Sequence, residues 1–135
     1  MKYLAVAAAM MTLAAPAFAD GDAAKGEADF KKCKACHAIV APDGTEVVKG
    51  GKTGPNLWGL DGKIVGSTED FKYGDSIVSV GAAGTVWTAE EIEAYVGDPA
   101  AWLKEKTGDD KAKTKMTYKL AKGAEDMAAY LVSIK

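Results

Sequence analysis

Residues 33–37 read Cys33-Lys34-Ala35-Cys36-His37, a C-x-x-C-H stretch that holds both cysteines and the only histidine of the 135-residue chain. This spacing is the attachment signature of c-type haem, because two thiols three positions apart can add to the two vinyl groups of one haem. The residue that follows then places an imidazole on the iron. The stretch therefore predicts one covalently bound haem c, attached through Cys33 and Cys36, with His37 as an axial ligand.

Three other kinds of site use closely spaced cysteines. A thioredoxin-like redox pair expects a βαβ setting, which the sequence pattern does not indicate. A disulfide between such close cysteines would close a very short loop of little stabilising value. A zinc site would need a second pair of ligands, and the chain has no further cysteine or histidine. Haem attachment is the interpretation that the sequence favours.

The second axial ligand must come from another residue type, and a thioether is the usual partner of histidine in electron carriers. Of the five methionines, Met1, Met10 and Met11 belong to an N-terminal leader. Met127 falls on the apolar stripe of the last expected helix, where methionine usually fills the core. Met116 lies in a polar, lysine-rich loop without apolar periodicity. We therefore expect Met116 to bind the iron, the alternative being an exposed loop methionine.

The first 19 residues have the order of a secretory signal peptide, with Lys2, an apolar run and Ala17-Phe18-Ala19 before Asp20. An uncleaved membrane anchor is the alternative, but the run is short and rich in alanine for a span. We expect residues 1–19 to be cleaved and residues 20–135 to form one domain without a membrane anchor. The compartment is then an exported, oxidising one, the periplasm.

The charge balance argues against nucleic-acid binding. All 17 basic residues are lysine, 19 residues are acidic, and the formal net charge is −2. Nucleic-acid proteins normally show a basic excess and often use arginine for base readout. Hydrophobic residues make up 48% of the chain, which is typical of a folded globule rather than a disordered tail.

Helix signals alternate with long loops. A glycine-rich stretch from Ala38 to Gly66 contains a tight turn at Pro42-Asp43-Gly44, and no segment shows a convincing strand period. The fold class is therefore predicted to be all-α, with four to five short helices. These are a helix capped by Asp22 and ending near Cys36, one over 75–80 ending at Gly81, one after the capping box Thr88-Ala89-Glu90-Glu91, one starting at Asp98-Pro99, and one over about 123–134.

These features together resemble a known family, the class I cytochromes c, and within it the larger type of bacterial cytochrome c2. The resemblance covers essentially the whole mature chain and implies the cytochrome c fold, in which short helices and long loops wrap around one covalently bound haem. Residues 41–56 and 107–113 look like the insertions of the larger type. The motifs that carry the resemblance are Gly26, Phe30, the haem motif, Thr53-Gly54-Pro55-Asn56-Leu57, Phe71-Lys72-Tyr73-Gly74, Trp87, Thr114-Lys115-Met116-Thr117-Tyr118 and Tyr130-Leu131.

The resemblance also implies roles around the haem. The carbonyl of Pro55 would accept a hydrogen bond from Nδ1 of His37 and so fix the orientation of the ring. Tyr73 and Trp87 would donate to one haem propionate, the alternative being ordinary core packing. Thr114 would bond the other propionate.

Lysines close to the haem-bearing segments are expected to bind redox partners. In the family such lysines surround the exposed haem edge, whereas the alternative for each is a solvated surface position. Where many relatives have an arginine near the propionates, this chain has Lys63, which cannot make the same forked contact. The expected partner-binding residues are Lys32, Lys34, Lys52, Lys113, Lys115 and Lys119.

A haem held between two protein ligands has no open position for substrate, so electron transfer rather than catalysis is expected. The resemblance implies a monomeric, periplasmic mono-haem carrier in respiration or photosynthesis. It would move electrons from a cytochrome bc1 complex to a terminal oxidase, a photosynthetic reaction centre or another periplasmic reductase by transient electrostatic docking. The alternative is a haem-based ligand-binding protein or weak peroxidase in which Met116 is displaced.

Overall fold

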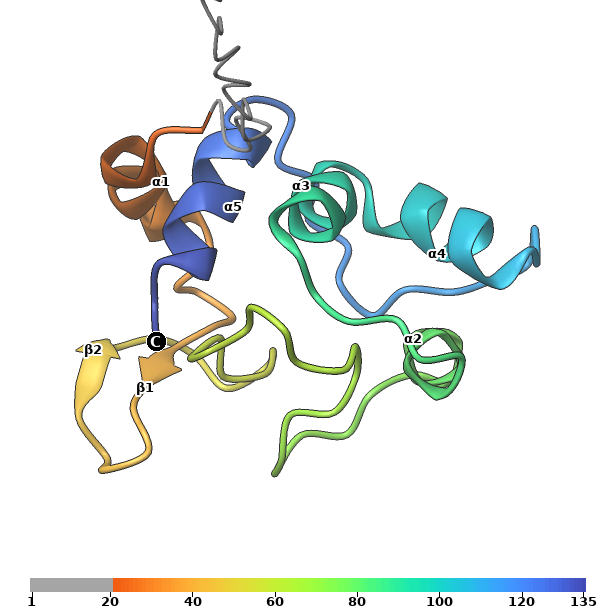
Figure 1. Cartoon of the computed structure of the whole chain (residues 1–135), viewed down its shortest axis with the longest axis horizontal. Coiled ribbons are helices and arrows are strands. Elements are labelled where there is room, and N and C mark those ends of the chain that lie inside the picture. The colour runs from red at the N-terminus through yellow and green to blue at the C-terminus, as the bar shows by residue number, and fades with distance from the viewer. Residues whose placement is uncertain (1–20) are drawn as a thin grey trace, which may run out of the picture.

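Helices joined by long loops make up most of the structure (Figure 1). The computed structural model describes residues 21–135, so the expected signal peptide and its cleavage position lie outside the described residues. None of the described helices is both long and apolar enough to cross a membrane. The helices are α1 (Ala23–Asp29), a 3₁₀ helix η1 (Phe30–Lys32), α2 (Asp75–Ala82), α3 (Ala89–Gly97), α4 (Pro99–Thr107) and α5 (Ala124–Val132).

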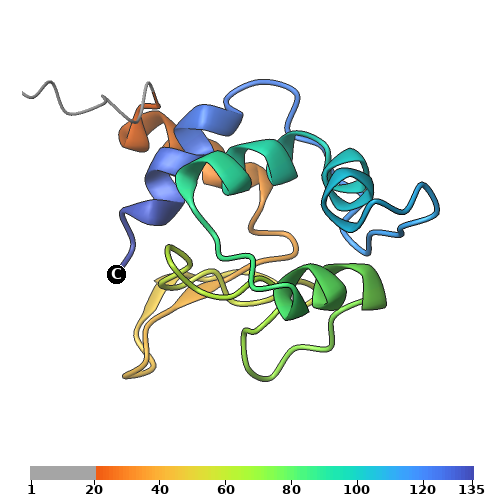
Figure 2. The same ribbon diagram turned by 45° about the vertical axis from the view of Figure 1, so that its right-hand side comes forward.

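The two ends of the described chain meet where α1 crosses α5, which both ribbon views show side by side (Figures 1 and 2). Gly26 permits the close approach, because a Cβ at this position would lie 2.1 Å from the carbonyl oxygen of Asp126. The rings of Phe30 and Tyr130 pack edge to face with centroids 5.8 Å apart. Asp22 caps α1 as expected and accepts from the backbone N–H of Ala24 at 2.9 Å.

The first helix is shorter than the sequence predicted. Regular α-helix ends at Asp29, and the chain continues through η1 into turns rather than reaching Cys36. Within the motif the backbone N–H groups of Cys36 and His37 both donate to the carbonyl of Cys33, at 3.1 and 3.0 Å. The motif is therefore held in hydrogen-bonded turns rather than in the regular helix.

The all-α fold class is confirmed, and a small antiparallel sheet that the sequence did not indicate accompanies the helices. Strand β1 (Ile39–Val40) pairs with β2 (Glu46–Val48) across the turn predicted at 42–44. Gly44 N–H donates to the carbonyl of Ala41 at 2.9 Å, which confirms that turn. Strands of two and three residues are too short to show an alternating pattern in the sequence.

The break between α3 and α4 follows the predicted signals. Thr88 caps α3 by accepting from Glu91 N–H, and Asp98 caps α4 by accepting from Ala101 N–H, with Pro99 at the first helical position. Helix α2 extends to Ala82, slightly beyond the predicted end. The core lies between α1, α3, α4 and α5 and includes Phe30, Ile92, Trp102, Leu103, Met127 and Leu131.

Candidate haem site

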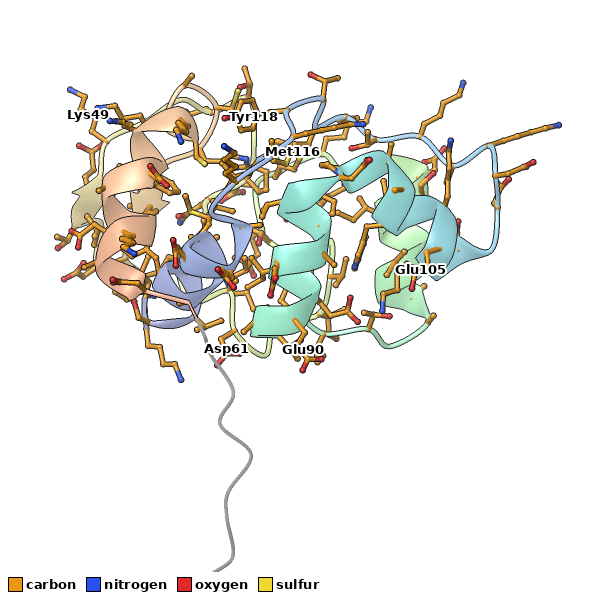
Figure 3. All side chains as sticks on the ribbon, turned by 90° about the horizontal axis from the view of Figure 1, so that it is seen from above. Lys49, Asp61, Glu90, Glu105, Met116 and Tyr118 are labelled. Atoms are coloured by element: carbon orange, nitrogen blue, oxygen red, sulfur yellow. The ribbon has the colours of Figure 1, made fainter. Side chains whose placement is uncertain are left out.

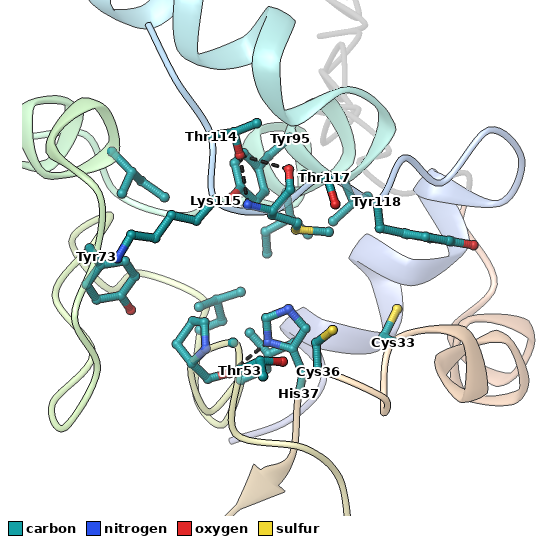
Figure 4. Close-up of a pocket in the computed structure, with 18 of the residues that line it drawn as sticks. Cys33, Cys36, His37, Thr53, Tyr73, Tyr95, Thr114, Lys115, Thr117 and Tyr118 are labelled. Carbon is teal, nitrogen blue, oxygen red and sulfur yellow. Dashed lines mark hydrogen bonds between the residues drawn. The ribbon is translucent and has the colours of Figure 1, made fainter.

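A cavity of about 300 Å³ opens between the haem motif and the loop that follows α4 (Figure 4). Cofactor sites of this size are typically apolar with a few convergent polar groups. The wall combines apolar side chains such as Leu57, Ile77 and Leu131 with the polar residues discussed below. Every residue that the sequence assigned to haem binding lines it, namely Cys33, Cys36, His37, Pro55, Tyr73, Trp87, Thr114 and Met116.

His37 is buried, with 9% of its surface exposed, and its ring is fixed on two sides. Nδ1 donates to the carbonyl of Pro55 at 2.8 Å. Gly54 packs flat against the ring, since a Cβ there would lie 2.4 Å from Cε1. With its proton on Nδ1, the imidazole has the lone pair of Nε2 free for a metal.

Burial also favours the metal-binding form of His37. It lowers the pKa of the imidazole, and the hydrogen bond to Pro55 only partly opposes this. A lowered pKa keeps the ring neutral at physiological pH, and the neutral ring is the form that binds iron.

The two cysteines lie on the same side of the cavity as His37, and neither is in a disulfide (Figure 4). Cys33 is partly buried and Cys36 exposed. Burial raises the pKa of the Cys33 thiol, and nearby Lys32 opposes that shift. Within residues 21–135 no group of three or more His, Cys, Asp or Glu side chains is placed to hold a metal ion, so the donor set fits haem attachment rather than a zinc site.

The loop that contains Met116 forms the opposite wall. Thr114, Lys115 and Thr117, which flank the methionine, lie across the cavity from His37 (Figure 4). The Oγ1 of Thr114 accepts from Met116 N–H at 3.1 Å and donates to the carbonyl of Met116 at 2.9 Å. Nζ of Lys115 donates to the carbonyl of Lys72 at 2.9 Å, which connects this loop to the loop before α2.

Met127 lines the cavity too, but from the core face of α5, where 1% of its surface is exposed. The structure thus places both remaining methionines at the cavity. Only Met116 comes from the loop that faces His37.

The hydroxyl proton of Thr114 is used within the protein, on the Met116 carbonyl. A hydroxyl has one proton to donate, so a bond from Thr114 to a propionate would replace this contact. The propionate role of Thr114 stays a prediction.

Aromatic side chains form the wall between α3 and the loop before α2. Trp87 is 6% exposed and stacks on Trp102 with ring centroids 5.3 Å apart. The Tyr73 ring packs against Phe71 at 4.8 Å, and its oxygen accepts from Thr68 N–H at 3.3 Å, which leaves the phenol proton free to donate.

Tyr95 is a cavity residue that the sequence reasoning missed. It lies on α3 and packs edge to face against both Trp87 and Trp102, at 5.2 Å from each. Burial raises the pKa of its phenol, and the hydroxyl of Thr114 opposes the shift. In the sequence Tyr95 follows a capping box together with the apolar residues Ile92 and Val96, and a tyrosine in that company is a signal for a polar group facing a site.

The expected partner-binding lysines are all exposed, but they differ in their contacts. Lys32, Lys113 and Lys115 line the cavity. Lys32 pairs with Asp29 at 3.4 Å and Lys119 with Asp98 at 3.1 Å. Lys34, Lys52 and Lys119 are not among the residues that line the cavity, and Lys63 instead donates to the carbonyl of Trp58 at 3.0 Å.

The chain is similar over nearly its whole length to curated cytochromes. It is 63% identical to cytochrome c2 of Rhodobacter capsulatus over 130 residues, 96% of this chain and 94% of the relative. It is 56% identical to cytochrome c-550 of Paracoccus versutus over 126 residues, 91% of this chain and 82% of the relative. No family model matches the chain.

Solved structures of the same group of cytochromes are similar to the fold of this chain. The molecular structure of cytochrome c2 from Rhodobacter capsulatus superimposes with a TM-score of 0.82 at 65% identity, covering 84% of this chain and 97% of that one. Ferric cytochrome c-550 from Paracoccus versutus gives a TM-score of 0.82 at 56% identity, covering 84% and 98%. With its C-x-x-C-H motif facing a cavity inside the cytochrome c fold, the chain belongs to the class I c-type cytochromes of the cytochrome c2 group, electron-transfer proteins that carry one covalently attached haem c.

Proposed function

We propose that this cytochrome is a soluble periplasmic carrier whose iron is closed by His37 and Met116. It accepts single electrons from a cytochrome bc1 complex and passes them to a terminal oxidase, a photosynthetic reaction centre or another periplasmic reductase. The observation that carries the proposal is the arrangement of the cavity, in which the fixed imidazole of His37 lies on one wall and the Met116 loop on the other.

Bound haem supplies a one-electron iron couple, and a thioether ligand raises its reduction potential by favouring Fe(II). The chain's own residues attach the haem, shield it from water and position its ligands. Cys33 and Cys36 attach the group, the apolar wall excludes water, and the hydrogen bonds of Thr114 to both backbone groups of Met116 hold the ligand loop in place. Tyr73 and Trp87 are the proposed donors to a propionate.

Partner recognition is proposed to depend on charge. A carrier must bind and leave quickly, which favours small interfaces steered by electrostatics. Asp61 and Glu90 lie on the side of the molecule opposite Met116 and Tyr118 (Figure 3). A chain of formal net charge −2 can therefore present lysines at the haem edge to acidic partner surfaces.

Two measurements on protein purified from the periplasm test the proposal. The intact mass should equal that of residues 20–135 plus one haem, since cleavage after Ala19 is expected. The reduced protein should not bind carbon monoxide at neutral pH, because both axial positions are filled. Carbon monoxide binding would instead favour the ligand-binding alternative, and an uncleaved N-terminus would contradict the soluble carrier.

A further inference from the structure

The side chain of Asn56 makes three hydrogen bonds to the backbone beside the haem motif. Its Oδ1 accepts from the N–H groups of Val40, at 2.9 Å, and Trp58, at 3.1 Å. Its Nδ2 donates to the carbonyl of Val40 at 2.8 Å. One amide thus binds both backbone groups of Val40, in strand β1, and also the chain that follows Asn56 itself.

These contacts lie next to the hydrogen bond that orients His37. Asn56 directly follows Pro55, whose carbonyl accepts from His37 Nδ1 at 2.8 Å, and Val40 comes three residues after His37. The peptide group that contains the Pro55 carbonyl ends at Asn56. The Asn56 side chain therefore ties the residue next to that carbonyl to Val40.

Backbone hydrogen bonds join the same two segments on either side of Pro55. Gly54 N–H donates to the carbonyl of Cys36 at 2.8 Å, and Leu57 N–H donates to the carbonyl of Ala38 at 3.1 Å. These bonds set the distance between the segments. Between them, the Asn56 side chain adds three further hydrogen bonds, two to Val40 and one to Trp58.

We propose that Asn56 is a positioning residue of the haem site, which holds the Pro55 carbonyl in line with Nδ1 of His37. The inference rests on the proposed ligation of iron by His37. A hydrogen bond from Nδ1 to a carbonyl makes the imidazole a more basic ligand. A more basic ligand stabilises the more positively charged ferric state, so Asn56 keeps the reduction potential lower than it would be without this alignment.

The test compares the Asn56→Ala holoprotein with the wild type and with Ile39→Val as a matched control. Ile39 is fully buried in β1, so the shorter side chain loosens the same strand without removing a hydrogen bond to Pro55 or Asn56. The midpoint potential is measured by redox titration, and the solvent exchange of the Nδ1 proton of His37 by NMR of the reduced protein.

Asn56→Ala should raise the midpoint potential and speed exchange of the Nδ1 proton at least about tenfold, because the side-chain bonds that hold its acceptor are lost. Ile39→Val, which only loosens the strand, should neither raise the midpoint potential nor speed exchange of the Nδ1 proton. The sign of the shift is decisive, since general loosening would admit water, stabilise the charged ferric haem and lower the potential. An unchanged or lower potential, or unchanged exchange, would overturn the role of Asn56.

Asn56→Ser is the second variant in case the alanine protein does not fold. Its shorter side chain cannot reach both backbone groups of Val40, so it should shift the potential and the exchange in the same directions by less. Failure of the proposed function looks different. If His37 were not a ligand, the wild type itself would lack the shifted, slowly exchanging Nδ1 resonance of an iron-bound imidazole.

Discussion

At the scale of single residues, Glu91 stabilises the aromatic wall of the haem site from outside the cavity. Its Oε2 accepts from Trp102 Nε1 at 2.7 Å, and its Oε1 is paired with Lys106. Trp102, 3% exposed, stacks on Trp87 with an angle of 18° between the rings. The position of Trp87 therefore depends on a carboxylate that does not touch the cavity.

Glu91→Ala should lower the free energy of unfolding by about 1–3 kcal/mol, because the buried indole N–H of Trp102 loses its acceptor. Glu91→Gln should cost about 1 kcal/mol or less, since an amide oxygen can still accept from the indole and only the part-exposed pair with Lys106 is lost. Denaturant unfolding of the holoproteins, followed by circular dichroism, measures both. Equal losses would show that the ion pair, not the indole bond, is the stabilising contact.

At the scale of secondary-structure elements, the crossing of α1 and α5 holds the haem motif against the core. The crossing depends on Gly26, where a Cβ would meet both the carbonyl of Asp126 and, at 2.7 Å, the Cβ of Tyr130. The backbone of Asp126 cannot move aside as the end of a flexible side chain could. Cys33 follows this crossing directly through η1, so a shift of α1 also moves the attachment site.

Gly26→Ala should therefore destabilise the protein by about 1–3 kcal/mol or more, through overpacking of the two helices. Gly97→Ala is the matched control, because Gly97 lies at the end of α3, where an added Cβ would have nothing within 4 Å. It should leave the free energy of unfolding within about 0.5 kcal/mol of wild type. Thermal unfolding of both holoproteins distinguishes them, and equal melting temperatures would contradict the close crossing.

The sequence predicted these elements unevenly, for physical reasons. The starts of α1, α3 and α4 were correct because a side chain caps each one. The all-α fold class is confirmed, but the end of the first helix was predicted too late and the two short strands were missed, because tertiary contacts rather than local pattern decide them. The aromatic contacts of Tyr95 and the bonds of Asn56 could not be predicted, since they depend on segments that meet only in the folded chain, although a tyrosine beside Ile92 and Val96 was a signal for a polar group at the site.

At the scale of the whole molecule, partner binding depends more on where the charges lie than on the net charge. Lys32 and Lys119 have carboxylate partners, whereas the ion pairs of residues 21–135 do not include Lys34, Lys52, Lys113 or Lys115. Lys34 is exposed and lies between the two haem-attaching cysteines. Lysines of this kind are the ones expected to steer an acidic partner.

Lys34→Glu should slow association with the proposed partner, a bc1 complex, at low ionic strength, and the difference from wild type should shrink as salt rises. Lys135→Glu changes the net charge by the same amount but at the C-terminus, where Lys135 pairs with Asp61 at 3.4 Å. It should slow association less. Stopped-flow rates over a range of salt concentrations measure the effect, and identical slopes for the two variants would rule out steering by the haem edge.

The central claim is that His37 and Met116 together close the iron, and one spectroscopic comparison tests it most directly. Ferric haem with a sulfur ligand has a weak far-red absorption band, which should be recorded for Met116→Leu and Met127→Leu, two identical changes at the two methionines that line the cavity. Met116→Leu should lose the band, whereas Met127→Leu, a volume-conserving core change, should keep it. A band that survives in Met116→Leu and disappears in Met127→Leu would contradict ligation of the iron by Met116.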